Sequence, residues 1–170
     1  PYHLRGLVID FGAAIPFIPG HSLNVTTSMA RTTCNYASPD AITSCYKKDY
    51  QYNERSDIWA LGCILYETFV GLPLCRVNLS PAQRMMVESL NVDAQLNARI
   101  QAQLFNACNF LTQVTDDQLL EKARDVEVKV GKQWADLFYQ IVSRKNTVSL
   151  DQILSHPALQ IYRRVSPSLE

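Results

Sequence analysis

The clearest pattern in the sequence is a run of apolar residues, IWALGCILY at positions 58–66, with no polar face. A helix that is apolar all round lies at the centre of a protein. Ser56 is a suitable N-cap for such a helix, and Gly71 and Pro73 would end it. The sequence therefore predicts a buried central helix over residues 55–70.

Further apolar residues at helical spacing predict a bundle around this helix. Pro is favoured at the first position of a helix and Ser just before it, so a short helix is expected after Pro39, capped by Ser38. The other predicted helices cover residues 80–90, 93–110, 115–125, the stretch from Trp134 to Val142, and a last short helix from Ser149 to Leu154.

Strand character is confined to the N-terminal end. Leu7–Ile9 is a short β-branched run, and Asp10–Gly12 after it has the composition of a turn. Residues 13–35 are rich in Pro, Ser, Thr and Asn, which predicts a long loop, and loops of this length are commonly functional. The predicted fold is mainly α, a helical bundle around a buried central helix with a short β remnant at the N-terminus.

Composition narrows the class of protein. The chain has 170 residues, of which 47% are apolar and 19% charged, so it is long and apolar enough to form one domain with its own core. Sixteen basic residues balance sixteen acidic ones, so no broad basic face for nucleic acid or anionic lipid is expected. Only six residues are Gly, which is few for a protein that uses glycine-rich loops to hold phosphate.

The cysteines and the apolar stretches indicate an intracellular protein, cytoplasmic or nuclear. No secretory leader is recognisable, and the stretch Ile58–Cys75 contains Glu67, Thr68 and Pro73, so it predicts a buried helix and no membrane span. The number of cysteines is odd and no spacing fits a zinc site, so we expect reduced and mostly buried thiols. They are Cys34, Cys45, Cys63, Cys75 and Cys108.

Four short motifs occur in a fixed order along the chain. They are the D-F-G segment Leu7–Gly12, the T-x-x-Y-x-S-P-D run Thr33–Asp40, the central-helix segment Ser56–Glu67, and the L-x-H-P run Leu154–Pro157. Together they resemble the C-terminal lobe of a eukaryotic protein kinase of the serine/threonine or dual-specificity type. The central-helix segment is the most specific of the four.

The resemblance implies a partial kinase domain over residues 1–165, with an activation segment at 10–40, a helical core at 41–160 and a tail at 166–170. The parent protein would transfer the γ-phosphoryl group of ATP to protein hydroxyls with the help of Mg²⁺. The family's catalytic base, glycine-rich loop and ATP-binding lysine would all lie before residue 1. No catalytic residue is therefore expected in this segment, which should be inactive without its N-terminal lobe.

Three residues of the D-F-G segment have roles implied by the resemblance. Asp10 would be a ligand of Mg²⁺, which prefers carboxylate and phosphate oxygens. Phe11 would pack below it as an apolar support. Gly12 would give the backbone the freedom to aim the carboxylate.

Hydroxyl residues of the long loop are the candidates for regulation and substrate positioning. Ser28 and Thr27, and after them Thr26, lie where such kinases carry an activating phosphate, which orders a loop by pairing with arginine. Thr33 matches the threonine that serine/threonine kinases place beside the substrate hydroxyl. The alternative for all four is an ordinary polar loop residue.

Two further acidic residues are expected to support the structure. Asp57 would bond backbone groups of the catalytic loop or interact with the helix dipole. Asp40 stands where the family has Glu, and Thr147 stands where the arginine partner of that Glu is expected. Arg144 or Lys145 could substitute for that arginine.

These departures leave a second function open. A weakened contact at Asp40 is typical of a pseudokinase that serves as a binding scaffold, whereas the intact D-F-G segment favours an enzyme. An unrelated all-α interaction module is the third possibility.

The subfamily has two candidates. Residues 35–42 resemble monopolar-spindle-type kinases, and residues 71–74 resemble the cyclin-dependent group. The expected partners are a protein substrate and the chain's own N-terminal lobe, with no nucleic acid and no membrane.

Overall fold

The computed structural model describes most of the helical part of the chain. The described residues are 14, 23–24, 34–41, 51–52, 54–75, 79–145 and 147–163. They are mainly helical, as the sequence predicts. The expected strand at residues 7–9 lies outside them.

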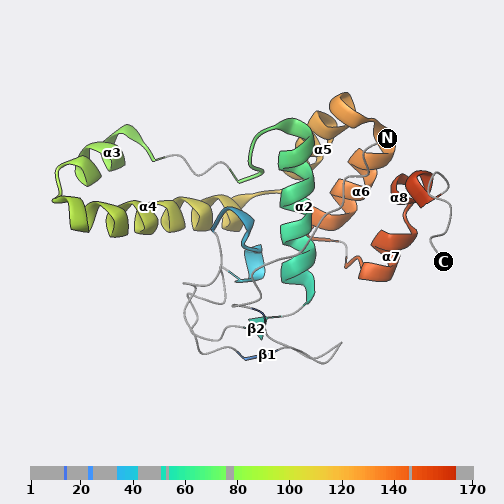
Figure 1. Cartoon of the computed structure of the whole chain (residues 1–170), viewed down its shortest axis with the longest axis horizontal. Helices are drawn as coiled ribbons and strands as arrows, with labels where there is room; N and C mark the ends of the chain where they lie inside the picture. The colour runs from blue at the N-terminus through green and yellow to red at the C-terminus, as the bar shows by residue number, and fades with distance from the viewer. Residues whose placement is uncertain are drawn as a thin grey trace.

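Helices account for nearly all of the described elements (Figure 1). The two short strands form an antiparallel pair in which Leu23 lies opposite Tyr52. In chain order the elements are β1 (Leu23–Asn24), η3 (Cys34–Tyr36), β2 (Gln51–Tyr52), α2 (Glu54–Val70), α3 (Pro81–Glu88), α4 (Val92–Gln113), α5 (Asp116–Val130), α6 (Lys132–Val142), α7 (Leu150–Ser155) and α8 (Pro157–Arg163).

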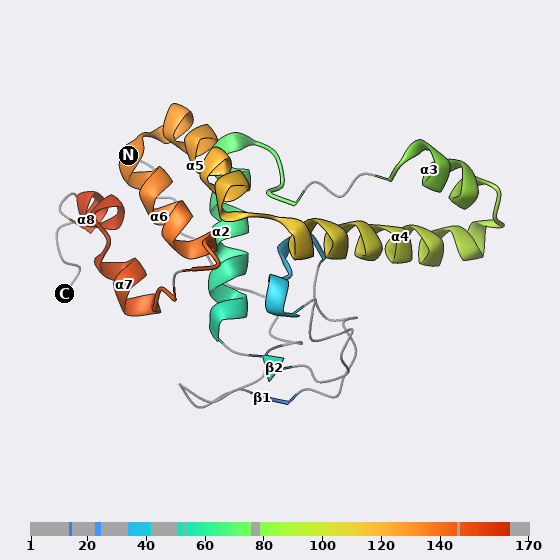
Figure 2. The same cartoon turned by 180° about the vertical axis from the view of Figure 1, so that it is seen from behind.

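The central helix predicted from the apolar run is α2. It packs against α5 and α6 on one side and against η3 on another (Figures 1 and 2). Trp59, Cys63 and Tyr66 are almost completely buried along it. Ile64 was expected in the core, but 52% of its surface is exposed, because the elements packed on α2 leave that side of the helix uncovered. The central helix is thus buried on most of its circumference and open along one line.

Helix α6 crosses close to α2 at Gly62. A Cβ atom at this position would lie 2.6 Å from Cγ1 of Val142 and 2.7 Å from Cγ2 of Ile141, which is closer than atoms can approach. Phe138 on α6 is fully buried beside Tyr66, with the ring centroids 5.4 Å apart. Glycine is therefore required at position 62 for this helix–helix distance.

Helices α3 and α4 form an arm that extends away from α2 (Figures 1 and 2). The C-terminal turns of α4 anchor the arm, since Ala107 and Leu111 are fully buried. Toward the other end Val92 is 81% exposed. Two hydrogen bonds between the side-chain amides of Gln83 and Asn106, 3.0 and 3.1 Å long, hold α3 along α4.

Capping residues explain why several helices differ in length from the prediction. Asn91 caps α4, which continues to Gln113, three residues beyond the predicted end. The helix predicted for 115–125 continues to Val130, and it ends at Gly131, whose φ of 97° is difficult for other residues. The sequence analysis does not predict helix α8, because the L-x-H-P motif by itself does not indicate a helix over residues 157–163.

Two predictions about cysteines and membranes can be compared with the described residues. Cys63 and Cys75 are buried free thiols, which confirms the expectation for these two. Of the helices that the structure describes, none has both the length and the apolar character needed to cross a bilayer.

The contact at Gly62 gives a first test of the fold. Gly62→Ala should lower the free energy of unfolding by about 1–3 kcal/mol through overpacking, although Ala favours helix by ~1 kcal/mol. Urea unfolding of the full chain measures this. In a Val142→Ala background, which removes the nearest clashing atom, the loss should be smaller. A stabilised Gly62→Ala variant would contradict the close packing of α2 and α6.

Candidate functional site

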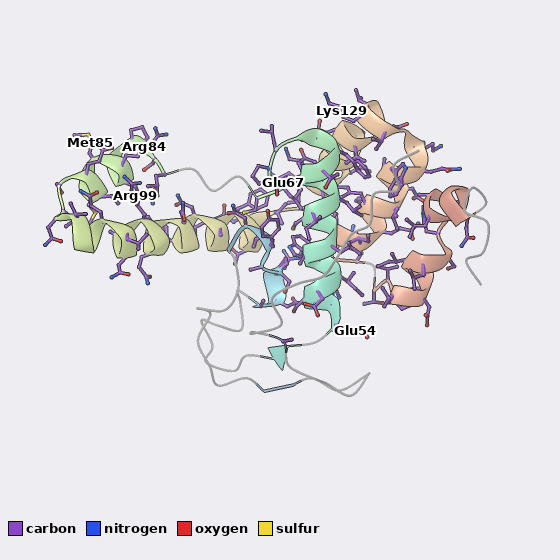
Figure 3. The ribbon with its side chains drawn as sticks, in the orientation of Figure 1. Glu54, Glu67, Arg84, Met85, Arg99 and Lys129 are labelled. Carbon is purple, nitrogen blue, oxygen red and sulfur yellow. The ribbon has the colours of Figure 1, made fainter. Side chains whose placement is uncertain are left out.

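The segment of residues 34–41, which contains most of the T-x-x-Y-x-S-P-D run, lies against α2. The hydroxyl of Tyr36 donates a hydrogen bond of 2.6 Å to Oε2 of Glu67, in the last turn of α2. Figure 3 shows Glu67 toward the upper end of α2, on the side where η3 lies. The hydrogen bond to this carboxylate, followed by burial, raises the pKa of Tyr36 above its ordinary value. One end of the segment is thereby fixed to α2 by a charge-assisted hydrogen bond.

The other end of the segment is fixed at the first turn of α2. The Ser38 hydroxyl accepts a hydrogen bond from the Ala41 amide at 3.1 Å, so Ser38 caps the helical turn that starts at Pro39, as predicted. The same oxygen lies 3.3 Å from Oγ of Ser56, and both serines are buried. The segment is therefore attached near both ends of one helix.

A second polar contact joins α2 to α5. The Tyr66 hydroxyl donates to Oδ2 of Asp125 at 2.9 Å. Lys122 lies 5.6 Å from the centre of the Tyr66 ring and 3.8 Å from the same Asp125 oxygen. Burial, followed by the hydrogen bond to Asp125, raises the pKa of Tyr66. The hydroxyl at this position is thus kept protonated, as a donor to the carboxylate.

The histidine of the L-x-H-P run has a structural role. His156 is buried, and its Nδ1 accepts the amide hydrogen of Ala158 at 3.2 Å. Nε2 then carries the proton and lies 3.1 Å from Oδ2 of Asp136 on α6. The imidazole thereby attaches the junction of α7 and α8 to α6, and both of its nitrogens have hydrogen-bond partners.

Most of the predicted site residues lie outside the described residues. These are Asp10, Phe11, Gly12, Thr26, Thr27, Ser28 and Thr33. Their roles therefore stay predictions. Within the described ranges no three potential metal ligands lie together. The two remaining candidates are described, and both Asp40 and Asp57 are exposed.

The substitute ion pair expected for Asp40 is not formed. Among the described residues no ion pair within 4.0 Å joins Asp40 to a basic side chain. Lys145 Nζ lies instead 3.5 Å from Oδ2 of Asp116, and Oδ1 of Asp116 accepts the Arg144 amide at 3.1 Å. The Lys145 ammonium therefore pairs with a carboxylate in the first turn of α5 and not with Asp40, while Arg144 contacts that carboxylate only through its backbone amide.

Sequence reasoning missed three residues of this region: Glu67, Asp125 and Asp116. Each receives a hydrogen bond from a residue at least 27 positions away. No local pattern indicates which tyrosine or amide such a carboxylate will meet. For Asp116 a weak signal exists, because it directly follows Thr115, which caps α5.

Comparison with known proteins shows the family. Residues 6–157 match the family model described as protein kinase domain, which is most of the chain. The chain therefore belongs to the protein kinase domain family. No solved structure matches it significantly.

Curated relatives match over shorter stretches. The chain is 37% identical over 70 residues to the probable serine/threonine-protein kinase mps1 of Dictyostelium discoideum, covering 39% of this chain and 7% of that protein. It is 45% identical over 67 residues to the serine/threonine-protein kinase Nek2 of Mus musculus, covering 38% and 13%. It is 38% identical over 74 residues to the serine/threonine-protein kinase ATG1 of Debaryomyces hansenii, covering 42% and 7%. The chain thus matches only a small part of each relative's length.

The contact between Tyr36 and Glu67 can be measured with a double-mutant cycle. Tyr36→Phe, Glu67→Gln and the double variant should give a coupling energy of about 1 kcal/mol in urea unfolding, since a hydrogen bond to a carboxylate is lost. Tyr139→Phe is the matched control, because no interaction of the Tyr139 hydroxyl is present in the described part, and it should change stability by less than ~0.5 kcal/mol. A coupling energy near zero would show that the segment is not attached through this pair.

Alkaline pH gives a second test. Burial, with a smaller contribution from Cys75, raises the pKa of Cys63 from 9.0 to about 12. Folding thus favours the protonated thiol, so stability is full below pH 9 and falls as pH rises from 9 toward 12, by about 1.4 kcal/mol per pH unit. In Cys63→Ala the decline should be shallower between pH 9 and pH 10, and it should steepen above pH 10, where Tyr36 and Tyr66 also favour the protonated, folded form.

The control for this titration is Val126→Ala, which creates a core cavity without removing a titrating group. It should lower stability at every pH and keep the slope of the unmodified chain. Urea midpoints between pH 8 and pH 11 provide the data. Equal slopes for the Cys63→Ala and Val126→Ala variants would refute the assignment to the Cys63 thiol.

Proposed function

We propose that this chain forms the activation segment and helical lobe of a serine/threonine protein kinase that transfers the γ-phosphoryl group of ATP to protein hydroxyls. The observation that carries the proposal is the match of residues 6–157 to the protein kinase domain, which includes the D-F-G segment. The activation segment would occupy residues 10–40 and the helical core residues 41–160.

Asp10 is the residue that would hold Mg²⁺. Mg²⁺ in such sites takes one or two carboxylates together with phosphate oxygens, and Asp10 is a carboxylate of this kind. When bound, the ion would neutralise charge on the phosphates of ATP. Phe11 would support Asp10 from below, and Gly12 would allow its backbone to turn.

The attachment of residues 34–41 to α2 supports the roles assigned to the preceding loop. Thr33 directly precedes η3, so a fixed η3 would hold Thr33 where it can position a substrate hydroxyl. Thr26, Thr27 and Ser28 come earlier in the sequence. A phosphate on one of them would order the loop by pairing with arginine.

The chain would act together with other parts of a kinase. A catalytic loop would supply the base, and an N-terminal lobe would supply the ATP-binding lysine and the glycine-rich loop, so the segment alone should have no activity. The substrate would be a protein, and the setting would be intracellular, in the cytoplasm or the nucleus.

One observation favours a second function, that of a pseudokinase scaffold. The carboxylate of Asp40 is exposed and makes no ion pair with the described basic residues. A kinase whose activation segment is less firmly held could retain the fold as a binding surface and lose catalysis.

A chimera separates the two functions. In it, this chain follows the N-terminal lobe and catalytic loop of an active serine/threonine kinase. We expect Mg²⁺-dependent transfer of phosphate from ATP to a serine or threonine peptide, and a loss of about 100-fold or more with Asp10→Asn, because a metal ligand is removed. The assay is radiolabelled phosphate transfer.

Asp151→Asn is the matched control for the chimera, since Asp151 is an exposed acid on α7, and it should leave the rate unchanged. The 170-residue chain alone should show no turnover. A folded but inactive chimera would favour the scaffold. Turnover by the chain alone that Asp10→Asn abolishes would contradict the expected inactivity of the segment.

A further inference from the structure

A pocket of about 180 Å³ lies where the end of the 34–41 segment meets the first turns of α2 and the end of α6. At roughly 30 Å³ per water, it has room for about six waters or for a small organic group of similar size. Part of its wall is apolar and consists of Pro39, Trp59, Ile141 and Val142. The pocket can therefore accept a short aliphatic stem as well as a polar head.

The polar part of the pocket is mainly cationic. Its charged residues in the described part of the chain are Arg55, Arg144 and Asp40, which together carry one net positive charge. Nη2 of Arg55 donates to the carbonyl oxygen of Arg144 at 3.3 Å, so the two arginines are held at the same place. The Arg144 amide is fixed in turn by Asp116. No ion pair of the Arg144 guanidinium is formed within the described part of the chain.

The indole of Trp59 adds a second, independent observation. Trp59 is one of the residues that line the pocket, and 5% of its surface is exposed. Among the described residues, the Nε1 of Trp59 is the one buried side-chain polar atom that has no hydrogen-bond partner. A buried donor without an acceptor costs about 1–3 kcal/mol, so an acceptor that came within hydrogen-bond distance of Nε1 would be stabilising.

These features select the kind of ligand. A carboxylate is planar and can accept two parallel hydrogen bonds from a guanidinium. One or two methylene groups behind it would contact the apolar wall, which a phosphate could not use. Because Asp40 and Arg144 are both exposed, the pocket can be entered from solvent.

We propose that this pocket binds the carboxylate of a glutamate or aspartate side chain that another polypeptide presents, with Arg144 as its principal partner. Among the described residues that line the pocket, Asp40 is the one acid, and its charge opposes the incoming carboxylate. The inference does not depend on ATP, on Mg²⁺ or on the proposed phosphoryl transfer.

The chain has two tryptophans, which makes a direct measurement possible. Trp134 packs edge-on against Phe69, with the ring centroids 5.0 Å apart, and does not line the pocket. In the ¹⁵N-labelled full chain, N-acetyl-glutamate amide should shift the Trp59 indole resonance saturably and leave that of Trp134 in place. N-acetyl-glutamine amide, which lacks the charge, should shift neither.

Three variants test the assignment of the partners. Arg144→Gln should weaken binding about tenfold, as expected for one lost charge-assisted hydrogen bond. Asp40→Asn should strengthen binding, because it removes the opposing charge. Arg124→Gln removes the same charge from an exposed position on α5 and should leave the affinity unchanged.

Several results would overturn the proposal. They are the absence of a saturable shift at Trp59, equal effects of Arg144→Gln and Arg124→Gln, and weaker binding in Asp40→Asn. Inorganic phosphate tested at the same ionic strength should bind more weakly than the blocked glutamate. Equal or tighter binding of phosphate would show that the pocket binds anions in general, which would contradict the proposed carboxylate ligand.

Discussion

The packing of α6 against α2 at Gly62 is the constraint on which the rest of the described structure depends. Without a side chain at position 62, Ile141 and Val142 come into direct contact with the backbone of α2. This crossing brings the end of α6 to the first turn of α2, where the Arg144 carbonyl accepts a hydrogen bond from Arg55. The wall that α6 contributes to the carboxylate pocket therefore depends on the absence of a side chain at position 62.

Helix α2 also sets the geometry of the motif region. Ser56 in its first turn and Glu67 in its last turn are 11 residues apart, which in an α-helix is about 16 Å. Ser38 and Tyr36 bind to these two positions from a single short segment. Because α2 is stiff and buried on most sides, any substrate-positioning role of this segment depends on the packing of the helix behind it.

The sequence predicted local structure well and distant contacts poorly. The central helix was predicted because its apolar run and its flanking residues are all local, whereas the exposure of Ile64 depends on which elements pack beside it. The turn capped by Ser38 was predicted for the same local reason. The hydrogen bond from Tyr36 joins residues 31 positions apart, and that from Arg55 joins residues 89 apart, so no periodicity could indicate them.

The position of Asp116 explains why Lys145 does not pair with Asp40 within the described structure. A carboxylate in the first turn of α5 is stabilised by the helix dipole. It accepts hydrogen bonds from the Ser143 hydroxyl and the Arg144 amide and lies 3.5 Å from Lys145, so it binds three successive residues. The loop after α6 is then fixed without Asp40. The described segment at residues 34–41 is attached to α2 by the hydrogen bonds of Tyr36 and Ser38. Its acidic end lies beside a cationic pocket that a second carboxylate can enter.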